Sequence, residues 1–123
     1  MASASVHPLP PGSTIGIMGG GQLGRMTALA AARLGYKCHI FTPETDSPGE
    51  QVSAAATIAD YEDRKALKSF ADAVDVVTFE FENDPAESAE FLAEHALVRP
   101  GAQCLAIAQD RLKEKDFINK TAP

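Results

Sequence analysis

The chain has 123 residues, 45% of them hydrophobic, which is enough for one domain with one modest core. Its formal net charge of −6 argues against nucleic acid as a partner, because binding a phosphate backbone requires clustered Lys and Arg. No apolar run approaches the ~18 residues of a membrane span. Cys38 and Cys104 form no CxxC pair, so we expect two reduced cysteines and a soluble, cytoplasmic protein.

The predicted elements alternate between strands and helices. Residues 1–13 are rich in Ala, Ser and Pro and lack the regions of a signal peptide, so we predict a disordered leader. In chain order, the patterns then predict a strand at 14–18, a helix at 22–34, strands at 37–41 and 55–58, a helix at 63–70, a strand at 75–79, a helix at 85–95, a strand at 97–99 and helices at 102–108 and 110–119. This alternation predicts an α/β, Rossmann-like domain with a parallel sheet of about five strands and helices on both faces.

A glycine cluster joins the first strand to the first helix. Gly19, Gly21 and Gly24 have the G-x-G-x-x-G spacing, which permits a tight turn, close approach of the Gly21 backbone to a ligand and close helix packing. The helix N-terminus attracts anions, so we expect a phosphorylated ligand here, with a purely structural turn as the alternative. The apolar stripe of this helix consists of Leu23, Met26, Thr27, Ala30 and Leu34.

Polar side chains follow the strand at 75–79. Glu80 and Glu82 are two residues apart, so both carboxylates project to one side of an extended chain, where they suit sugar hydroxyls or a cation. The alternative is a solvated loop in which Asp84 caps the next helix. Gln22 either presents its amide to a ligand or caps its own helix.

Other kinds of site find little support. A dinucleotide site needs a carboxylate at the end of the second strand, but Thr42 and Pro43 stand there and Glu44 lies past the proline. The three histidines show no metal-binding spacing, and no Ser/His/Asp or Cys/His set is present. We therefore predict neither a metal site nor a catalytic residue within this chain.

Five motifs in order resemble one family. They are Gly19-Gly20-Gly21-Gln22-Leu23-Gly24-Arg25-Met26, Asp46-Ser47-Pro48 with Gln51-Val52, Ala59-Asp60-Tyr61, Thr78-Phe79-Glu80-Phe81-Glu82, and Gln109-Asp110-Arg111-Leu112 with Lys115. Together they resemble the N-terminal, pre-ATP-grasp domain of N5-carboxyaminoimidazole ribonucleotide synthetase, an ATP-grasp ligase of purine biosynthesis. The sister family, the formate-dependent glycinamide ribonucleotide transformylase, typically has Glu in place of Gln22 and is less similar.

The resemblance implies a reaction and its residues. ATP and bicarbonate form carboxyphosphate, which carboxylates 5-aminoimidazole ribonucleotide with release of ADP and phosphate. By the same resemblance, Gln22 and Leu23 touch the ribonucleotide, Glu80 binds its ribose hydroxyls and Arg111 reaches ATP. We expect Gly21 to contact the ribonucleotide together with Gln22 and Leu23, because its backbone lies in the turn that approaches the ligand.

The resemblance also implies a domain organisation. Residues 14–108 correspond to the pre-ATP-grasp domain, and residues 109–123 lead toward an ATP-grasp domain that would hold most of the ATP and Mg²⁺ contacts. Members of the family are much longer, so we expect an N-terminal fragment, inactive alone, of an enzyme that forms a homodimer. The alternatives are a nicotinamide-dinucleotide-binding module and a non-catalytic regulatory domain of the same fold.

Overall fold

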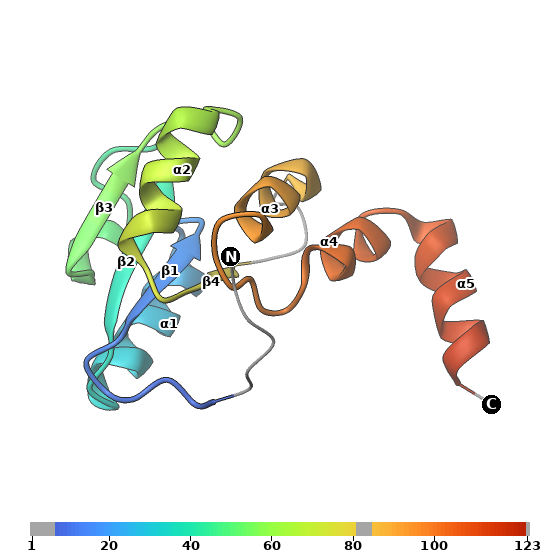
Figure 1. The fold of residues 1–123 in the computed structure, drawn as a ribbon, viewed down its shortest axis with the longest axis horizontal. Coiled ribbons are helices and arrows are strands. Elements are labelled where there is room, and N and C mark those ends of the chain that lie inside the picture. Colours follow the sequence, from blue (N-terminus) through green and yellow to red (C-terminus); the bar gives the residue numbers. More distant parts are fainter. Residues whose placement is uncertain (1–6, 81–84, 123) are drawn as a thin grey trace.

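A computed structural model describes residues 7–80 and 85–122 (Figure 1). Within these residues the strands are β1 (Thr14–Met18), β2 (Lys37–Thr42), β3 (Ala55–Ile58) and β4 (Val76–Phe79). The helices are α1 (Gln22–Arg33), the 3₁₀ turn η1 (Glu50–Val52), α2 (Arg64–Ala73), α3 (Ala86–Ala93), α4 (Ala102–Ala108) and α5 (Arg111–Thr121). Among the described helices, none has the length and apolar character needed to cross a membrane.

The sheet is parallel, with the strand order β3-β2-β1-β4. From β1 the chain moves outward through β2 to β3 and then returns to lay β4 on the other side of β1. The order therefore reverses between β1 and β4, whose carboxyl ends lie side by side. In open parallel sheets, ligands bind beside the strand ends at such a switch point.

The predicted α/β class is confirmed, although the fifth strand is reduced to a single contact. Val98 forms one isolated parallel bridge with Val77. The Val77 N–H donates to the Leu97 carbonyl (2.7 Å) and the Arg99 N–H donates to the Val77 carbonyl (2.9 Å). The described sheet has four strands rather than about five, because the chain turns away at residues 100–101 and enters α4.

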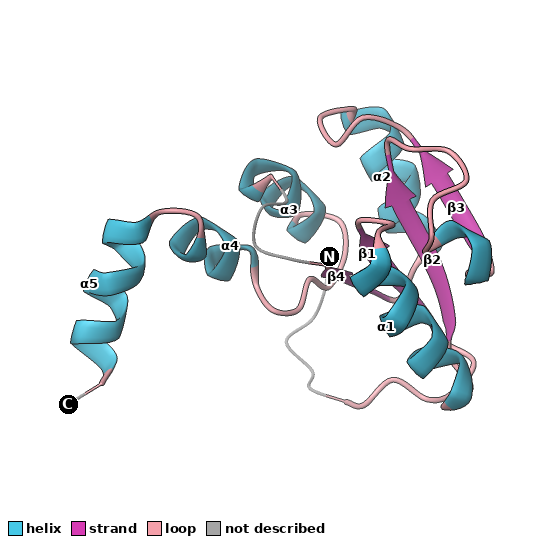
Figure 2. Ribbon diagram, turned by 180° about the vertical axis from the view of Figure 1, so that it is seen from behind, coloured by secondary structure: helices cyan, strands magenta, loops and turns pink. Residues whose placement is uncertain are grey.

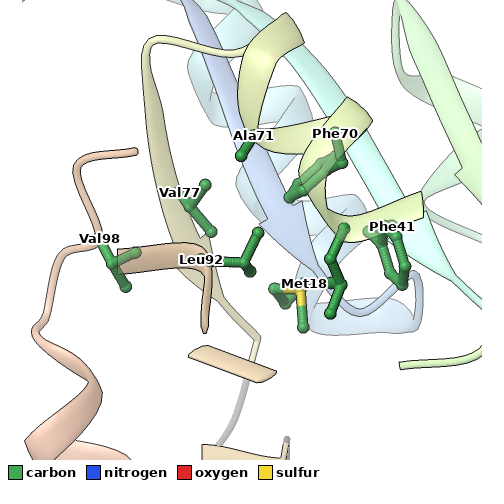
Figure 3. Close-up of a cluster of buried hydrophobic side chains, with 8 residues drawn as sticks. Met18, Phe41, Phe70, Ala71, Val77, Leu92 and Val98 are labelled. Atoms are coloured by element: carbon green, nitrogen blue, oxygen red, sulfur yellow. The ribbon is translucent and has the colours of Figure 1, made fainter. Parts of the chain in front are cut away.

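Helices cover both faces of the sheet. On one face, α1 packs on a buried cluster of Ile17, Ala28, Ala31, Cys38 and Ile40 (Figure 2). On the other face, α2 and α3 pack on a larger cluster of Met18, Phe41, Leu67, Phe70, Ala71, Val77, Leu92 and Val98 (Figure 3). Neighbouring residues of one strand, such as Ile17 and Met18, thus fill opposite cores, as the alternation of a strand requires. Leu67 and Phe70 of α2 are fully buried in this second core.

The predicted stripe of α1 is wrong as a packing face. Leu23, Met26 and Leu34 are 51%, 63% and 69% exposed, whereas the residues that face the sheet are Gly24, Ala28 and Ala31. A glycine at position 24 lets the first turn of the helix lie close to the glycine turn, because a Cβ on Gly24 would be 2.7 Å from the Gly19 carbonyl oxygen. The packing face of α1 is therefore the one with small residues, which permits close approach of the backbone, and not the one with large apolar residues.

The described part of the predicted leader is attached to the domain. The Tyr36 hydroxyl donates to the Leu9 carbonyl (2.6 Å), and the Gly12 N–H donates to the Gly35 carbonyl (2.8 Å). Residues 9–13 thus contact the segment between α1 and β2. Residues 1–6 are outside the described range, as is Asp84, the predicted cap of α3.

Candidate functional site

The switch point joins the glycine turn, residues 19–24, to the residue that follows β4. The Glu80 N–H donates to the Met18 carbonyl (3.0 Å), which extends the pairing of β4 with β1 by one step. The half-buried Glu80 carboxylate then reaches across the end of β1, where its Oε2 accepts a hydrogen bond from the Gly21 N–H (3.1 Å). A strand-end carboxylate and the N-terminus of α1 thus form one site, as the convergence of strand ends predicts.

Missing side chains make room for this carboxylate. A Cβ on Gly21 would lie 2.5 Å from Glu80 Oε1, and a Cβ on Gly19 would overlap Oε2. Gly19 also has φ of +108°, a conformation that favours glycine. The glycines at positions 19 and 21 are therefore required by the position of the Glu80 side chain, whether or not a ligand is bound.

Glu80 changes the expected chemistry of the turn. The first turn of α1 contains no acidic residue of its own, so Glu80 supplies the negative charge that a helix N-terminus favours. A second anion at this point would be repelled by the carboxylate. The arrangement thus suits ligand hydroxyl groups, which donate hydrogen bonds to carboxylate oxygens, better than it suits a phosphate.

The segment of residues 46–51 covers the other side of the turn. The Gly49 N–H donates to the Gly20 carbonyl (2.7 Å), and a Cβ on Gly20 would lie 2.5 Å from the Oγ of buried Ser47. Arg25 Nη1 donates to the Pro48 carbonyl (3.3 Å) and to Gln51 Oε1 (3.2 Å). Sequence reasoning assigned no role to these residues, although two motifs of the resemblance contain them.

The remaining predicted residues fall into two groups. Gln22 and Leu23 are exposed on the first turn of α1, directly beside Gly21. Gly21 occupies the cap position without any side-chain bond, so Gln22 does not cap the helix. Arg111 lies on α5, which projects away from the sheet in both views (Figures 1 and 2), and contacts Glu114 at 3.4 Å. The structure does not bring Arg111 to the glycine turn, and Glu82 lies outside the described residues.

The end of β2 lacks the acid of a dinucleotide site. Thr42 is buried, and its Oγ1 accepts a hydrogen bond from the Glu44 N–H (3.3 Å), while the Glu44 side chain points outward and is exposed. A ribose at this strand end would find no carboxylate in the described residues of β2.

A cavity of about 620 Å³ lies apart from the glycine turn, between α2, α3 and the start of α5. Its charged lining residues are Glu62, Arg64, Glu87, Asp110 and Lys113. The Arg64 guanidinium is already stacked over the Phe91 ring, 4.8 Å from its centroid. Mixed charge and the absence of Glu80 and Gly21 from the lining separate this cavity from the site at the switch point. In residues 7–80 and 85–122, no cluster of His, Cys, Asp or Glu is arranged to hold a metal ion.

Two titratable residues of β2 belong to the core rather than the site. Burial raises the pKa of the Cys38 thiol, which favours the unreactive thiol form. Burial lowers the pKa of His39, whose Nε2 lies 2.7 Å from Thr57 Oγ1 and whose ring meets Phe70 edge to face. Both side chains pack between the sheet and the helices that cover it.

Comparison with known proteins finds one family model and several similar proteins. Residues 12–109 match the family model of the ribonucleotide synthetase preATP-grasp domain. The chain is 54% identical over 113 residues to N5-carboxyaminoimidazole ribonucleotide synthase of Brucella melitensis, a match that covers 92% of this chain and 31% of the relative. The chain thus spans less than a third of that relative's length.

Solved structures show the same fold. The ADP complex of an N5-carboxyaminoimidazole ribonucleotide synthetase superposes with a TM-score of 0.87 at 46% identity, covering 91% of this chain and 30% of that one. The enzyme of Aspergillus clavatus, solved with ADP and 5-aminoimidazole ribonucleotide, gives a TM-score of 0.78 at 28% identity, covering 90% and 30%. Both likenesses extend over nearly all of this chain.

Proposed function

Because this chain belongs to the ribonucleotide synthetase preATP-grasp domain family, we propose that it is the ribonucleotide-binding domain of an ATP-grasp ligase. The reaction is the carboxylation of 5-aminoimidazole ribonucleotide by bicarbonate, driven by conversion of ATP to ADP and phosphate. The identity to the Brucella synthase and the Aspergillus complex with this ribonucleotide support the proposal. The observation that carries it is the hydrogen bond between the Gly21 N–H and Glu80 at the switch point.

Glu80 recognises the ribose in this proposal. One carboxylate oxygen, Oε2, is occupied by the Gly21 N–H, which orients the group. Within the described residues Oε1 accepts no hydrogen bond, and we propose that it accepts hydrogen bonds from ribose hydroxyls, since a carboxylate can accept two neighbouring donors. The exposed amide of Gln22 and the side chain of Leu23 contact the ribonucleotide from the adjacent helix turn.

The remaining reactants are held mainly by other parts of such an enzyme. ATP supplies the phosphoryl group that activates bicarbonate, and Mg²⁺ accompanies it. Arg111 is 82% exposed at its side chain and carries a guanidinium suited to a phosphate, so it is the residue of this chain proposed to reach ATP. The described residues offer no carboxylate cluster for Mg²⁺. We further propose a homodimeric enzyme that acts in the cytoplasm.

Calorimetric titration of the 123-residue chain tests the proposal. We expect heat of binding with 5-aminoimidazole ribonucleotide and none with NADH at the same concentration. Binding of NADH but not of the ribonucleotide would replace the proposal with the dinucleotide-binding alternative. A chain that binds neither ligand would favour the non-catalytic regulatory domain.

A further inference from the structure

One peptide unit of the glycine turn is held at both ends. The plane that joins Gly20 to Gly21 carries the Gly20 carbonyl, which accepts from the Gly49 N–H (2.7 Å), and the Gly21 N–H, which donates to Glu80 Oε2 (3.1 Å). A peptide is planar, so these two groups point in opposite directions and turn together. The bond to Gly49 therefore fixes the direction in which the Gly21 N–H points.

Glycines alone would not fix this plane. Residues on both sides of it lack a Cβ, so their backbone rotates more easily than that of other residues. If the Gly49 bond is released, the plane can turn and move the Gly21 N–H away from Glu80. The orientation of the carboxylate thus depends on how firmly residues 46–51 are held against the turn.

Arg25 holds that segment. Its Nη1 donates to the Pro48 carbonyl (3.3 Å) and to Gln51 Oε1 (3.2 Å), which places one cation beside the two residues that flank Gly49 and Glu50. Gln51 in turn donates from Nε2 to the Asp46 carbonyl (3.2 Å). Asp46, the first residue of this segment, has φ of +54°, a conformation that is uncommon outside glycine.

Contact between the backbones is equally close. A Cβ on Gly49 would lie 3.1 Å from the Gly20 Cα, so the contact leaves little room for a side chain at Gly49. A shift of residues 46–51 would move the Gly49 N–H relative to the Gly20 carbonyl that it binds.

We propose that Arg25 is a positioning residue that clamps residues 46–51 onto the Gly20–Gly21 peptide and so orients Glu80 toward its ligand. This inference rests on the proposed function for the identity of the ligand, a ribonucleotide. The clamp itself is a property of the unliganded chain. The side-chain hydrogen bonds of Arg25 within the described residues go to Pro48 and Gln51, so it acts on the peptide through the segment that contains Gly49.

The test compares Arg25→Met with Arg33→Met, which removes an exposed arginine from the other end of α1. Two quantities are measured on the ¹⁵N-labelled 123-residue chain: hydrogen exchange of the Gly49 and Gly21 amides, and the Kd of 5-aminoimidazole ribonucleotide. For Arg25→Met we expect exchange about tenfold faster at both amides and a Kd about tenfold higher, the loss expected for one charge-assisted hydrogen bond. Arg33→Met should match the unmodified chain.

Two further variants guard against a loss of folding. Gln51→Ala removes an acceptor of Arg25 from an exposed side chain, and we expect the same direction of change with a smaller size. Arg25→Lys keeps the charge but offers a single ammonium in place of the planar guanidinium, so an intermediate Kd is expected. Amides of β2, such as that of Ile40, should keep their protection in every variant.

The outcomes separate the clamp from the proposed function. Unchanged exchange at Gly49 and Gly21 in Arg25→Met would overturn the clamp. Faster exchange with an unchanged Kd would overturn the positioning role. If the unmodified chain does not bind the ribonucleotide, the proposed function fails, and exchange at Gly21 still decides whether Arg25 controls the peptide.

Discussion

Replacing Glu80 with alanine should separate ligand recognition from stability. The substitution removes the acceptor of the Gly21 N–H and the oxygen assigned to the ribose hydroxyls. Hydrogen bonds to a charged group contribute ~1.5–3 kcal/mol, so the ribonucleotide Kd should rise about tenfold to 150-fold. The Gly21 N–H becomes one of the unpaired donors of α1, which resembles removal of a helix cap and costs ~1 kcal/mol. For a domain of this size we expect Tm to fall by roughly 5 °C.

The assay is titration calorimetry with the ribonucleotide beside thermal unfolding of the same samples. Glu44→Ala is the matched control, because it removes an exposed acid at the end of the neighbouring strand β2 and should leave Kd and Tm unchanged. Glu80→Gln keeps a neutral acceptor and should weaken binding with a smaller loss of Tm. A Kd for Glu80→Ala within twofold of the unmodified chain, or the full loss of affinity in Glu82→Ala instead, would refute the assignment of Glu80.

Three further predictions concern the turn and the core. Gly21→Ala places a Cβ 2.5 Å from Glu80 Oε1 and displaces the carboxylate, so it should raise the ribonucleotide Kd about tenfold and lower Tm about as much as Glu80→Ala does. Its effect in calorimetry should add little to that of Glu80→Ala, and full additivity would contradict the shared mechanism. Gly24→Ala places a Cβ 2.7 Å from a carbonyl oxygen of the turn and should lower Tm by several degrees, although alanine is the better helix former. Gly101→Ala, with open space at its Cβ, is the control, and an equal Tm in both variants would contradict the packing argument. His39 has a lowered pKa, so the unfolded chain binds more protons and the free energy of unfolding should fall as pH drops through about 6.5. Denaturant unfolding between about pH 7.5 and 5.5 should show that the free energy of unfolding depends less on pH in His39→Gln than in the unmodified chain. An equal dependence on pH in the two proteins would show that His39 is not its source.

The order of elements was predictable because each has a local signal. Beta-branched and apolar runs marked β1, β2 and β4, and the glycine cluster marked the turn from β1 into α1. The meeting of Glu80 with the turn was also predictable, since both follow parallel strands and such strand ends converge. The fifth strand was not, because it depends on where residues 100–101 redirect the chain.

Three features depend on contacts between distant segments and could not be predicted from the sequence. The packing face of α1 depends on how closely its backbone approaches the glycine turn, so Gly24 faces inward and Leu23 remains exposed. The glycine turn was expected to bind a phosphate because a helix N-terminus attracts anions. In the structure the Glu80 carboxylate accepts the Gly21 N–H, so the turn favours ligand hydroxyl groups over a phosphate. The bonds of Arg25 to Pro48 and Gln51 span 23 and 26 residues, and no local pattern reports them.

The central claim of the proposed function is that Glu80, oriented by the Gly21 N–H, binds the ribose hydroxyls of a ribonucleotide. The most direct measurement is the amide chemical shift of Gly21 during titration of the 123-residue chain with 5-aminoimidazole ribonucleotide and with its 2′-deoxy analogue. We expect a saturable shift of Gly21 with the ribonucleotide and about tenfold weaker binding of the analogue, since one hydroxyl to carboxylate hydrogen bond is lost. Equal affinity for the two ligands, or saturation without a shift at Gly21, would contradict the account.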